Sequence, residues 1–199
     1  MSENDKLEAY RQKRDFAKTS EPSGSDRRKL EVKPRFVVQK HRSKRLHYDL
    51  RLEVEGVLKS WAVPKGPSVD TKDKRLAVPT EDHPLAYIDF EGTIPEGEYG
   101  AGSVIVWDIG TYENTTKIDE EEVPMAEALE KGHATVFLEG EKLLGGFALT
   151  RTGKGKNERW ILVKMKDDWA IPDLDILEAE PNSALTERSV EEVGGEEKS

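Results

Sequence analysis

Residues 46–54 read Leu-His-Tyr-Asp-Leu-Arg-Leu-Glu-Val, so hydrophobic and polar side chains alternate along this stretch. Because successive side chains of a β-strand point to opposite faces, the alternation predicts a strand with one face in a hydrophobic core. The other face carries His47, Asp49 and Arg51 in a row. Residues on one face of a strand lie roughly 6.6 Å apart. The imidazole and the carboxylate can therefore share one metal ion, and the guanidinium can reach an anion beside it.

Short hydrophobic segments with turn residues between them continue on both sides of this strand. We expect strands at residues 35–40, 46–54, 57–63, 75–78, 85–90, 104–109, 111–114, 133–138, 146–150 and 159–165. One helix is expected at residues 120–131, because acidic residues open it and Gly132 follows it, and a second short helix at residues 5–16. The expected fold class is mainly β, a small antiparallel β-barrel of about eight strands with one or two short flanking helices.

Composition suggests three regions in the 199 residues. We expect residues 1–33 to form a polar N-terminal arm, residues 34–170 the barrel domain, and residues 171–199 an acidic, disordered tail. The chain has no cysteine, which excludes disulfides, thiolate zinc sites and a cysteine nucleophile. No segment has the length of a membrane span and the first residues have no signal-peptide pattern, so we expect a cytoplasmic protein.

The net charge of −9 is unevenly distributed along the chain. Residues 1–75 carry 20 Lys or Arg and 12 Asp or Glu, whereas residues 76–199 carry 11 and 28. A basic N-terminal portion suits a polyanionic partner, although folding can also mix these charges over the surface. The charge asymmetry supports a polyanionic partner, because the basic portion also contains the histidine-containing stretch with His41 and His47.

The pattern H-x5-H-x-D, formed by His41, His47 and Asp49, is the main candidate for a metal site. Two imidazoles and one carboxylate suit Mn²⁺, Zn²⁺ or Fe²⁺ and leave positions open for water and substrate. Arg51 strengthens the candidate because a guanidinium binds phosphate through two parallel hydrogen bonds.

Other polar residues give weaker signals. His83 and Tyr87 could place two donors near an oxyanion, or they could be a turn histidine beside a half-buried tyrosine. Lys65 and Arg75 are candidates for DNA backbone contacts, or else solvated charges. His133 is interpreted as a surface histidine, because most isolated histidines have no ligand role. The glycine-dense segment 92–102 is interpreted as a tight barrel connection, because it lacks the features of a nucleotide-binding loop.

Several segments together carry a resemblance to a known family. They are FVVQKH at residues 36–41, LHYDLRLE at 46–53, WAVPKGP at 61–67, HPLAY at 83–87, IPEGEYGAG at 94–102 and WILVK at 160–164. With these motifs the chain resembles the 3′-phosphoesterase domain of bacterial DNA ligase D. It is more similar still to the free-standing versions of that domain in archaea and some bacteria.

The resemblance implies a manganese-dependent enzyme that acts on DNA 3′ ends. Such an enzyme removes a terminal ribonucleoside to leave a 3′-phosphate, and then removes the phosphate to leave a 3′-hydroxyl. The resemblance implies metal ligands at His41, His47 and Asp49; phosphate contacts at Arg51, His83 and Tyr87; residues for the diesterase step at Arg14, Asp15 and Glu21; and supporting residues at Gln39, Lys65 and Arg75. Unlike ligase D, this sequence shows no polymerase or ligase domain, so a separate ligase or polymerase is an expected partner.

Two other interpretations remain open at this point. His47 and Asp49 with His133 and Arg151 would fit an Fe(II)/2-oxoglutarate oxygenase, but that assignment leaves His41 and Arg51 unexplained. A non-catalytic DNA-end-binding module would use the same basic strand without hydrolysis.

If the histidines hold a metal they must be neutral, so activity should be lost below about pH 6.5.

Overall fold

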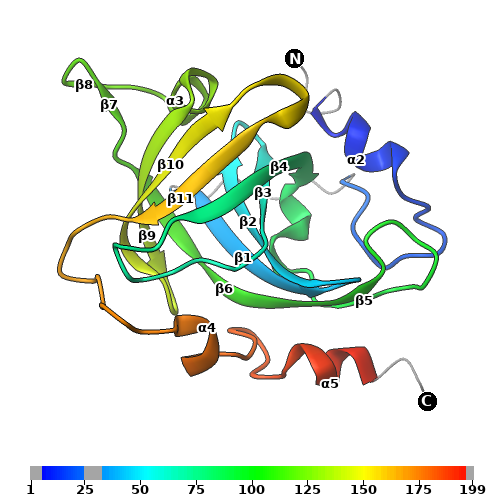
Figure 1. Cartoon of the computed structure of the whole chain (residues 1–199). Helices are drawn as coiled ribbons and strands as arrows, with labels where there is room; N and C mark the ends of the chain where they lie inside the picture. Colours follow the sequence, from blue (N-terminus) through cyan, green and yellow to red (C-terminus); the bar gives the residue numbers. More distant parts are fainter. Residues whose placement is uncertain (1–5, 25–32, 196–199) are drawn as a thin grey trace.

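Eight antiparallel strands close into a barrel in the computed structural model, which describes residues 6–24 and 33–195 (Figure 1). Around the barrel the strands are β1 (Arg35–Arg42), β2 (Leu46–Val54), β3 (Val57–Val63), β4 (Arg75–Pro84), β11 (Arg159–Lys164), β10 (Leu144–Gly153), β9 (His133–Gly140) and β6 (Gly102–Asn114). Pairing of β6 with β1 closes the ring, and the short strand β5 (Gly92–Ile94) adds to β6 outside it. The expected fold class, a small antiparallel β-barrel with few short helices, is confirmed.

The barrel interior is filled by the hydrophobic face of each strand. Phe36 and Val38 of β1 contribute to one buried cluster with Leu50 and Leu52 of β2. The space that remains among these side chains has a volume of only about 10 Å³. An eight-stranded barrel can be filled by side chains or can hold one small ligand; the small volume left here means that this barrel is filled, so a substrate must bind outside the interior.

A second hydrophobic cluster lies on the outer face of β1 and determines where the polar residues of β2 are placed. The 3-10 helix η1 (Leu85–Asp89) and the N-terminal segment cover this face, with Tyr10, Val37, Leu58 and Tyr87 among the buried side chains. Because both faces of β2 are covered, its polar residues Asp49, Arg51 and Glu53 are buried as well. The outer face of β1 and β2 therefore holds buried polar side chains next to a hydrophobic cluster.

Some sequence expectations were wrong in detail. Residues 85–90 are not a strand but η1, because a short, fully buried apolar run does not reveal its period. Helix α3 (Met125–Lys131) begins five residues later than expected. Pro124 is its N-cap, and residues 117–122 form the small hairpin of β7 (Lys117–Ile118) and β8 (Glu121–Glu122). The two strands expected at 104–109 and 111–114 are one continuous strand, β6.

The N-terminal arm and the acidic tail are more ordered than their composition indicated. Helix α2 (Glu8–Gln12) is shorter than the helix expected at 5–16, and residues 1–5 and 25–32 of the arm lie outside the described residues. In the tail, described up to residue 195, α4 (Ile176–Ala179) and α5 (Val190–Gly195) contact the barrel. Ile176 joins the barrel-interior cluster, and Val190 and Val193 cover Ile105. The expected disorder therefore does not hold for the described part of the tail, because a few apolar residues anchor it.

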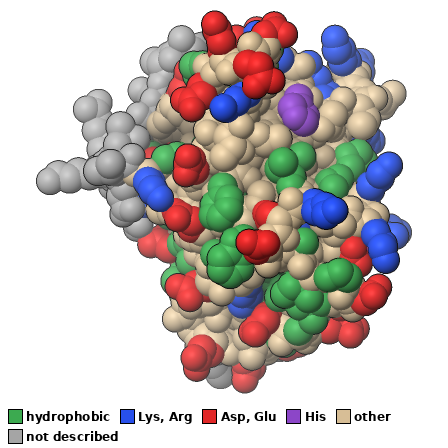
Figure 2. Space-filling model, turned by 90° about the vertical axis from the view of Figure 1, so that its left-hand side faces the viewer, with side chains coloured by type: hydrophobic (Ala, Val, Ile, Leu, Met, Phe, Trp, Pro, Cys, Tyr) green, Lys and Arg blue, Asp and Glu red, His purple; other side chains and the backbone are tan. Residues whose placement is uncertain are grey.

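None of the helices in the described part of the chain could span a membrane. On the face shown in Figure 2, the described basic side chains are scattered among acidic and hydrophobic ones. The described part of that face therefore shows no continuous basic patch.

Candidate metal and phosphate site

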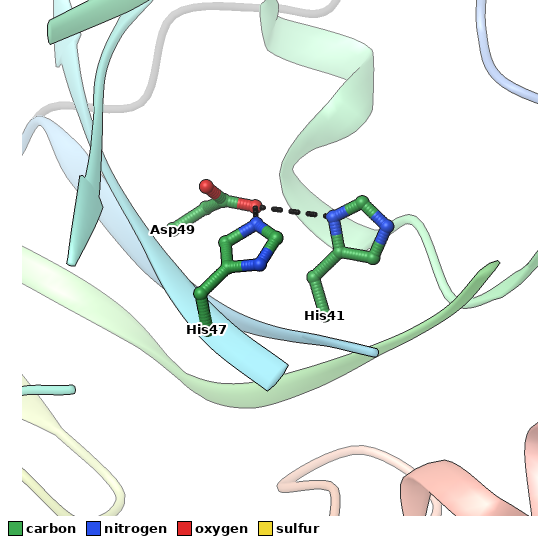
Figure 3. Close-up of side chains that lie close together, drawn as sticks. All are labelled: His41, His47 and Asp49. Carbon is green, nitrogen blue, oxygen red and sulfur yellow. Dashed lines mark ion pairs between the residues drawn. The ribbon is translucent and has the colours of Figure 1, made fainter. Parts of the chain in front are cut away.

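Neighbouring strands bring the three predicted metal ligands together. His41 lies directly opposite His47 in the β1–β2 pairing, and Asp49 follows two residues later on the same face of β2. Asp49 Oδ2 is 3.6 Å from His41 Nδ1 and 3.6 Å from His47 Nε2. Figure 3 marks both contacts with dashed lines. One ligand atom from each residue lies within 4.8 Å of the other two, so a single cation can contact all three.

Backbone carbonyl groups orient both imidazoles. Nε2 of His41 donates to the carbonyl oxygen of Gly100 at 2.7 Å, and Nδ1 of His47 donates to that of Arg45 at 3.0 Å. In a neutral imidazole the opposite ring nitrogen then carries a lone pair. These opposite nitrogens are the ones that face Asp49. Metal-binding histidines are usually held in this way, and two nitrogens with one carboxylate oxygen fit a divalent transition metal.

Charge–charge interactions adjust the ionisation of this cluster. Burial alone would raise the pKa of Asp49, but Arg51 and the two histidines outweigh it and hold that pKa well below its usual range. Burial alone would lower the pKa of His47, but the hydrogen bond and charge of Asp49 outweigh it and raise that pKa above 6.5. A bound metal and a proton on His47 therefore compete for the same lone pair.

Arg51 lies beside the ligand cluster and is held from two sides. Its Nη2 is 3.5 Å from Asp49 Oδ2, and its Nε donates to Oε1 of Gln39 at 2.7 Å. Gln39 is fully buried, and its Nε2 donates at 3.1 Å to the carbonyl oxygens of Tyr87 and Phe90. Gln39 thus links the guanidinium to η1.

His83 lies between two guanidinium groups. Its Nδ1 is 3.1 Å from Arg51 Nη1 and 2.9 Å from the carbonyl oxygen of Glu81, and its Nε2 is 3.4 Å from Arg14 Nη2. Burial and these two cations lower the pKa of His83 well below 6.5, so its imidazole is neutral. Its ring contacts that of Tyr87 edge-on, with the ring centroids 4.8 Å apart. The structure thus places His83 and Tyr87 together beside Arg51.

The N-terminal arm supplies part of the site. Arg14 Nε donates to Glu21 Oε1 at 2.9 Å, and Tyr87 Oη donates to the same oxygen at 3.0 Å. Nη1 of Arg14 also donates to Glu81 Oε1 at 3.1 Å. Two of the three arm residues implied by the resemblance, Arg14 and Glu21, therefore join the site. The third, Asp15, is exposed, and Lys18 forms an ion pair with it.

An open cleft of about 790 Å³ lies over these residues. Its lining includes side chains that sequence reasoning did not select, namely Ser43, Lys44, Glu81, Glu96, Glu98 and Tyr99. Residues 94–101 form much of one wall, although this segment was interpreted as a plain barrel connection. The position of Lys44 between two predicted metal ligands could have identified it, but no local pattern marks Glu81 or Tyr99.

Three other predicted or considered residues lie outside the cleft. Lys65 is exposed in the loop after β3, and Arg75 forms an ion pair with Asp73 at the start of β4. Neither is among the described residues that line the cleft. His133 is exposed on β9 and bonds to Thr150 Oγ1, so it does not join the described metal-ligand group. The ligand set that an oxygenase would need is therefore not assembled from His133.

Comparison with known proteins agrees with this geometry. Residues 39–151 match the family model described as the DNA Ligase D 3′-phosphoesterase domain. A multifunctional non-homologous end joining protein LigD from Pseudomonas aeruginosa is 52% identical over 96% of this chain and 22% of its own length. Its namesake from Mycolicibacterium smegmatis is 48% identical over 82% of the chain and 21% of its own length. The chain thus spans about a fifth of the length of these curated relatives.

Proposed function

This chain belongs to the DNA ligase D 3′-phosphoesterase domain family, and we propose that it is a metal-dependent phosphoesterase that repairs DNA 3′ ends. The proposed substrates are a strand with a 3′-terminal ribonucleoside, released by cleavage of its phosphodiester bond, and the strand with the 3′-phosphate that remains. The observation that carries the proposal is the convergence of His41, His47 and Asp49 beside the Arg51 guanidinium on one surface of the cleft.

The charge of the cleft supports the need for a cation. Three basic residues line it, Arg14, Lys44 and Arg51, against the four acidic residues Asp49, Glu81, Glu96 and Glu98. By formal charge, these side chains alone would not attract a phosphate. A divalent cation at the His41–His47–Asp49 group reverses the balance, and we propose Mn²⁺ as that ion, with other divalent transition metals also able to fit.

A bound divalent cation supplies positive charge to a phosphate oxygen and lowers the pKa of water beside it. The residues of the chain then bind and orient the phosphate. Arg51, anchored by Gln39, presents fixed N–H donors to its oxygens, where negative charge increases in the transition state. In the diesterase step, water adds to phosphorus, the bond to the ribonucleoside O5′ breaks, and that oxygen takes a proton.

The depressed pKa of His83 favours phosphate binding over protonation of the leaving oxygen as its role. A neutral imidazole has one N–H, which can donate to a phosphate oxygen in exchange for the Glu81 carbonyl, whereas protonating the leaving oxygen needs an imidazolium that Arg14 and Arg51 disfavour. Burial raises the pKa of Tyr87 well above 10, so its hydroxyl keeps its proton, which it donates to Glu21 in this structure. We therefore assign His83 and Tyr87 to phosphate binding, with the Tyr87 hydroxyl exchanging Glu21 for a phosphate oxygen and Glu21 still holding Arg14 in place.

The test uses two labelled primer-templates, one ending in a single ribonucleotide and one in a 3′-phosphate, incubated with protein and Mn²⁺. The expected products are a shortened 3′-phosphate strand and then a 3′-hydroxyl strand. The His41→Ala variant should produce neither, and His133→Ala is the matched control because His133 lies outside the ligand group. Binding of both substrates without any product would instead favour the DNA-end-binding module and refute the proposal.

A further inference from the structure

Tyr99 has no role in the proposed chemistry, yet its ring is open to the cleft. The side chain lies in the cleft wall formed by residues 94–101 and is 47% exposed. The other tyrosines beside the site, Tyr10 and Tyr87, are buried and hold neighbouring residues through their hydroxyls. Tyr99 is thus the aromatic side chain that the described cleft offers to a ligand.

Two cations of the N-terminal arm lie close to the Tyr99 ring. The Arg14 guanidinium is 5.3 Å from the ring centroid, and Lys13 Nζ is 4.8 Å from it. Arg14 is fixed by ion pairs with Glu21 and Glu81. Lys13 also pairs with Glu81 at 2.9 Å and donates to the Tyr99 hydroxyl at 3.4 Å, but its side chain is 42% exposed, whereas that of Arg14 is buried. An exposed ring bordered by a fixed guanidinium is the kind of surface on which nucleic-acid bases stack.

The charge of the same wall indicates which part of a nucleic acid fits there. Glu96 and Glu98 lie just before Tyr99 in the same segment and also line the cleft. Carboxylates repel the phosphates of a continuing strand, but they do not repel an uncharged nucleoside. In the diesterase reaction, the leaving nucleoside carries no phosphate beyond the scissile one. The wall therefore suits that terminal nucleoside and not the upstream strand.

The wall is also directly connected to the ligand cluster. The residue after Tyr99, Gly100, accepts the hydrogen bond from the His41 ring. Gly100 has a φ of 77°, which L side chains rarely adopt, so this turn of the backbone depends on glycine. Tyr99 is thereby held one residue from a group that contacts a metal ligand, next to the position proposed for the phosphate.

We propose that Tyr99 is the stacking platform for the base of the 3′-terminal nucleoside that leaves in the diesterase step, with Arg14 at the edge of the platform. This inference rests on the proposed function and deepens it. It assigns the two substrates different contacts, because a strand ending in a 3′-phosphate has no base beyond the phosphate. Tyr99 then affects removal of the ribonucleoside and not removal of the phosphate.

Kinetics on matched substrates tests this assignment. Tyr99→Ala should lower kcat/KM for ribonucleoside removal by roughly 5- to 150-fold, the range expected for loss of one stacked base. It should leave phosphate removal unchanged, and Tyr99→Phe, which keeps the ring, should match the wild type on both substrates. A terminal abasic ribose should slow the wild type to the rate of Tyr99→Ala and slow that variant no further. Equal losses on both substrates, or a further loss with the abasic ribose, would overturn the assignment.

A binding measurement without added metal separates this inference from the proposed function. The probe is a primer-template with a 3′-terminal 2-aminopurine ribonucleoside, whose fluorescence falls when the base stacks. The wild type and Tyr99→Phe should quench it, and Tyr99→Ala should not. Quenching of equal size by all three proteins would refute the stacking platform even if both reactions occur. Conversely, Tyr99-dependent quenching with no product would support the platform while refuting the hydrolase.

Discussion

Replacing Gln39 by methionine should separate the positioning of Arg51 from metal binding. The substitution keeps the approximate volume but deletes three hydrogen bonds, one to Arg51 and two to the carbonyl groups of Tyr87 and Phe90. Gln39 is 0% exposed, so water cannot readily replace them. Each orphaned buried group costs about 1–3 kcal/mol, which gives a loss of about 3 kcal/mol at the low end. For a domain of this size, the Tm should fall by about 6–12 °C.

The rate of 3′-ribonucleoside release by Gln39→Met should fall by more than the loss of stability alone would cause. Without the Gln39 oxygen, the Arg51 guanidinium is held only from the Asp49 side and can shift, and a displacement of about 1 Å can cost about 100-fold in rate. The affinity for Mn²⁺ should remain near that of the wild type, because none of the Gln39 hydrogen bonds reaches His41, His47 or Asp49.

The assay compares thermal unfolding, Mn²⁺ binding by electron paramagnetic resonance, and 3′-ribonucleoside release, at a temperature where every variant is folded. Leu162→Ala is the matched control. Leu162 is 4% exposed on β11 and belongs to the barrel-interior cluster, so the substitution should cost about 2–5 kcal/mol without touching Arg51. The reasoning is refuted if Gln39→Met turns over as fast as this control.

Three further changes test the site and the barrel. His41→Ala should abolish Mn²⁺ binding yet keep most DNA affinity, which depends mainly on Lys and Arg; retained Mn²⁺ binding in a direct titration would exclude His41 as a ligand. Because Asp49 raises the pKa of His47 above 6.5, protons should begin to displace Mn²⁺ above that pH. Affinity should then fall roughly tenfold per unit at lower pH, and a titration flat from about pH 8 to pH 6 would contradict this. Asp108 accepts hydrogen bonds from the backbone N–H groups of Ile109, Glu141, Lys142 and Leu143, and burial raises its pKa to about 6. Asp108→Asn turns an N–H donor toward at least one of these donors, so it should lower the free energy of unfolding by about 1–3 kcal/mol, and an unchanged urea midpoint would contradict that.

Residues 171–195 illustrate where composition misleads. The segment is acidic and shows little periodicity, so its sequence alone favours disorder. Yet Ile176, Val190 and Val193 each find a buried position on the barrel. Lys40 and Trp107 also donate to the carbonyl oxygens of Pro181 and Glu180. These three apolar residues and the two hydrogen bonds hold the segment on the barrel, because the barrel already provides a complementary surface. No local sequence pattern reveals that surface.

The sequence by itself determined the barrel class and the centre of the site. His41, His47 and Asp49 lie on two strands joined by a three-residue turn, so the period of two and the register of one hairpin are enough to place them together. Local periodicity is a property of neighbouring residues, and this part of the site is built from neighbouring residues.

Only the tertiary structure decided what surrounds that centre. Arg14 and Glu21 arrive from the arm, Glu81 from β4, and Tyr99 from the loop before β6. Their contacts with the site join residues far apart in the chain and depend on the closure of the barrel and the packing of η1 on its outer face. Such long-range contacts leave no trace in the spacing of residues. Local spacing therefore brings the candidate metal ligands together, whereas Arg14 and Glu21 were expected only from the family resemblance, and Glu81 and Tyr99 were not expected at all.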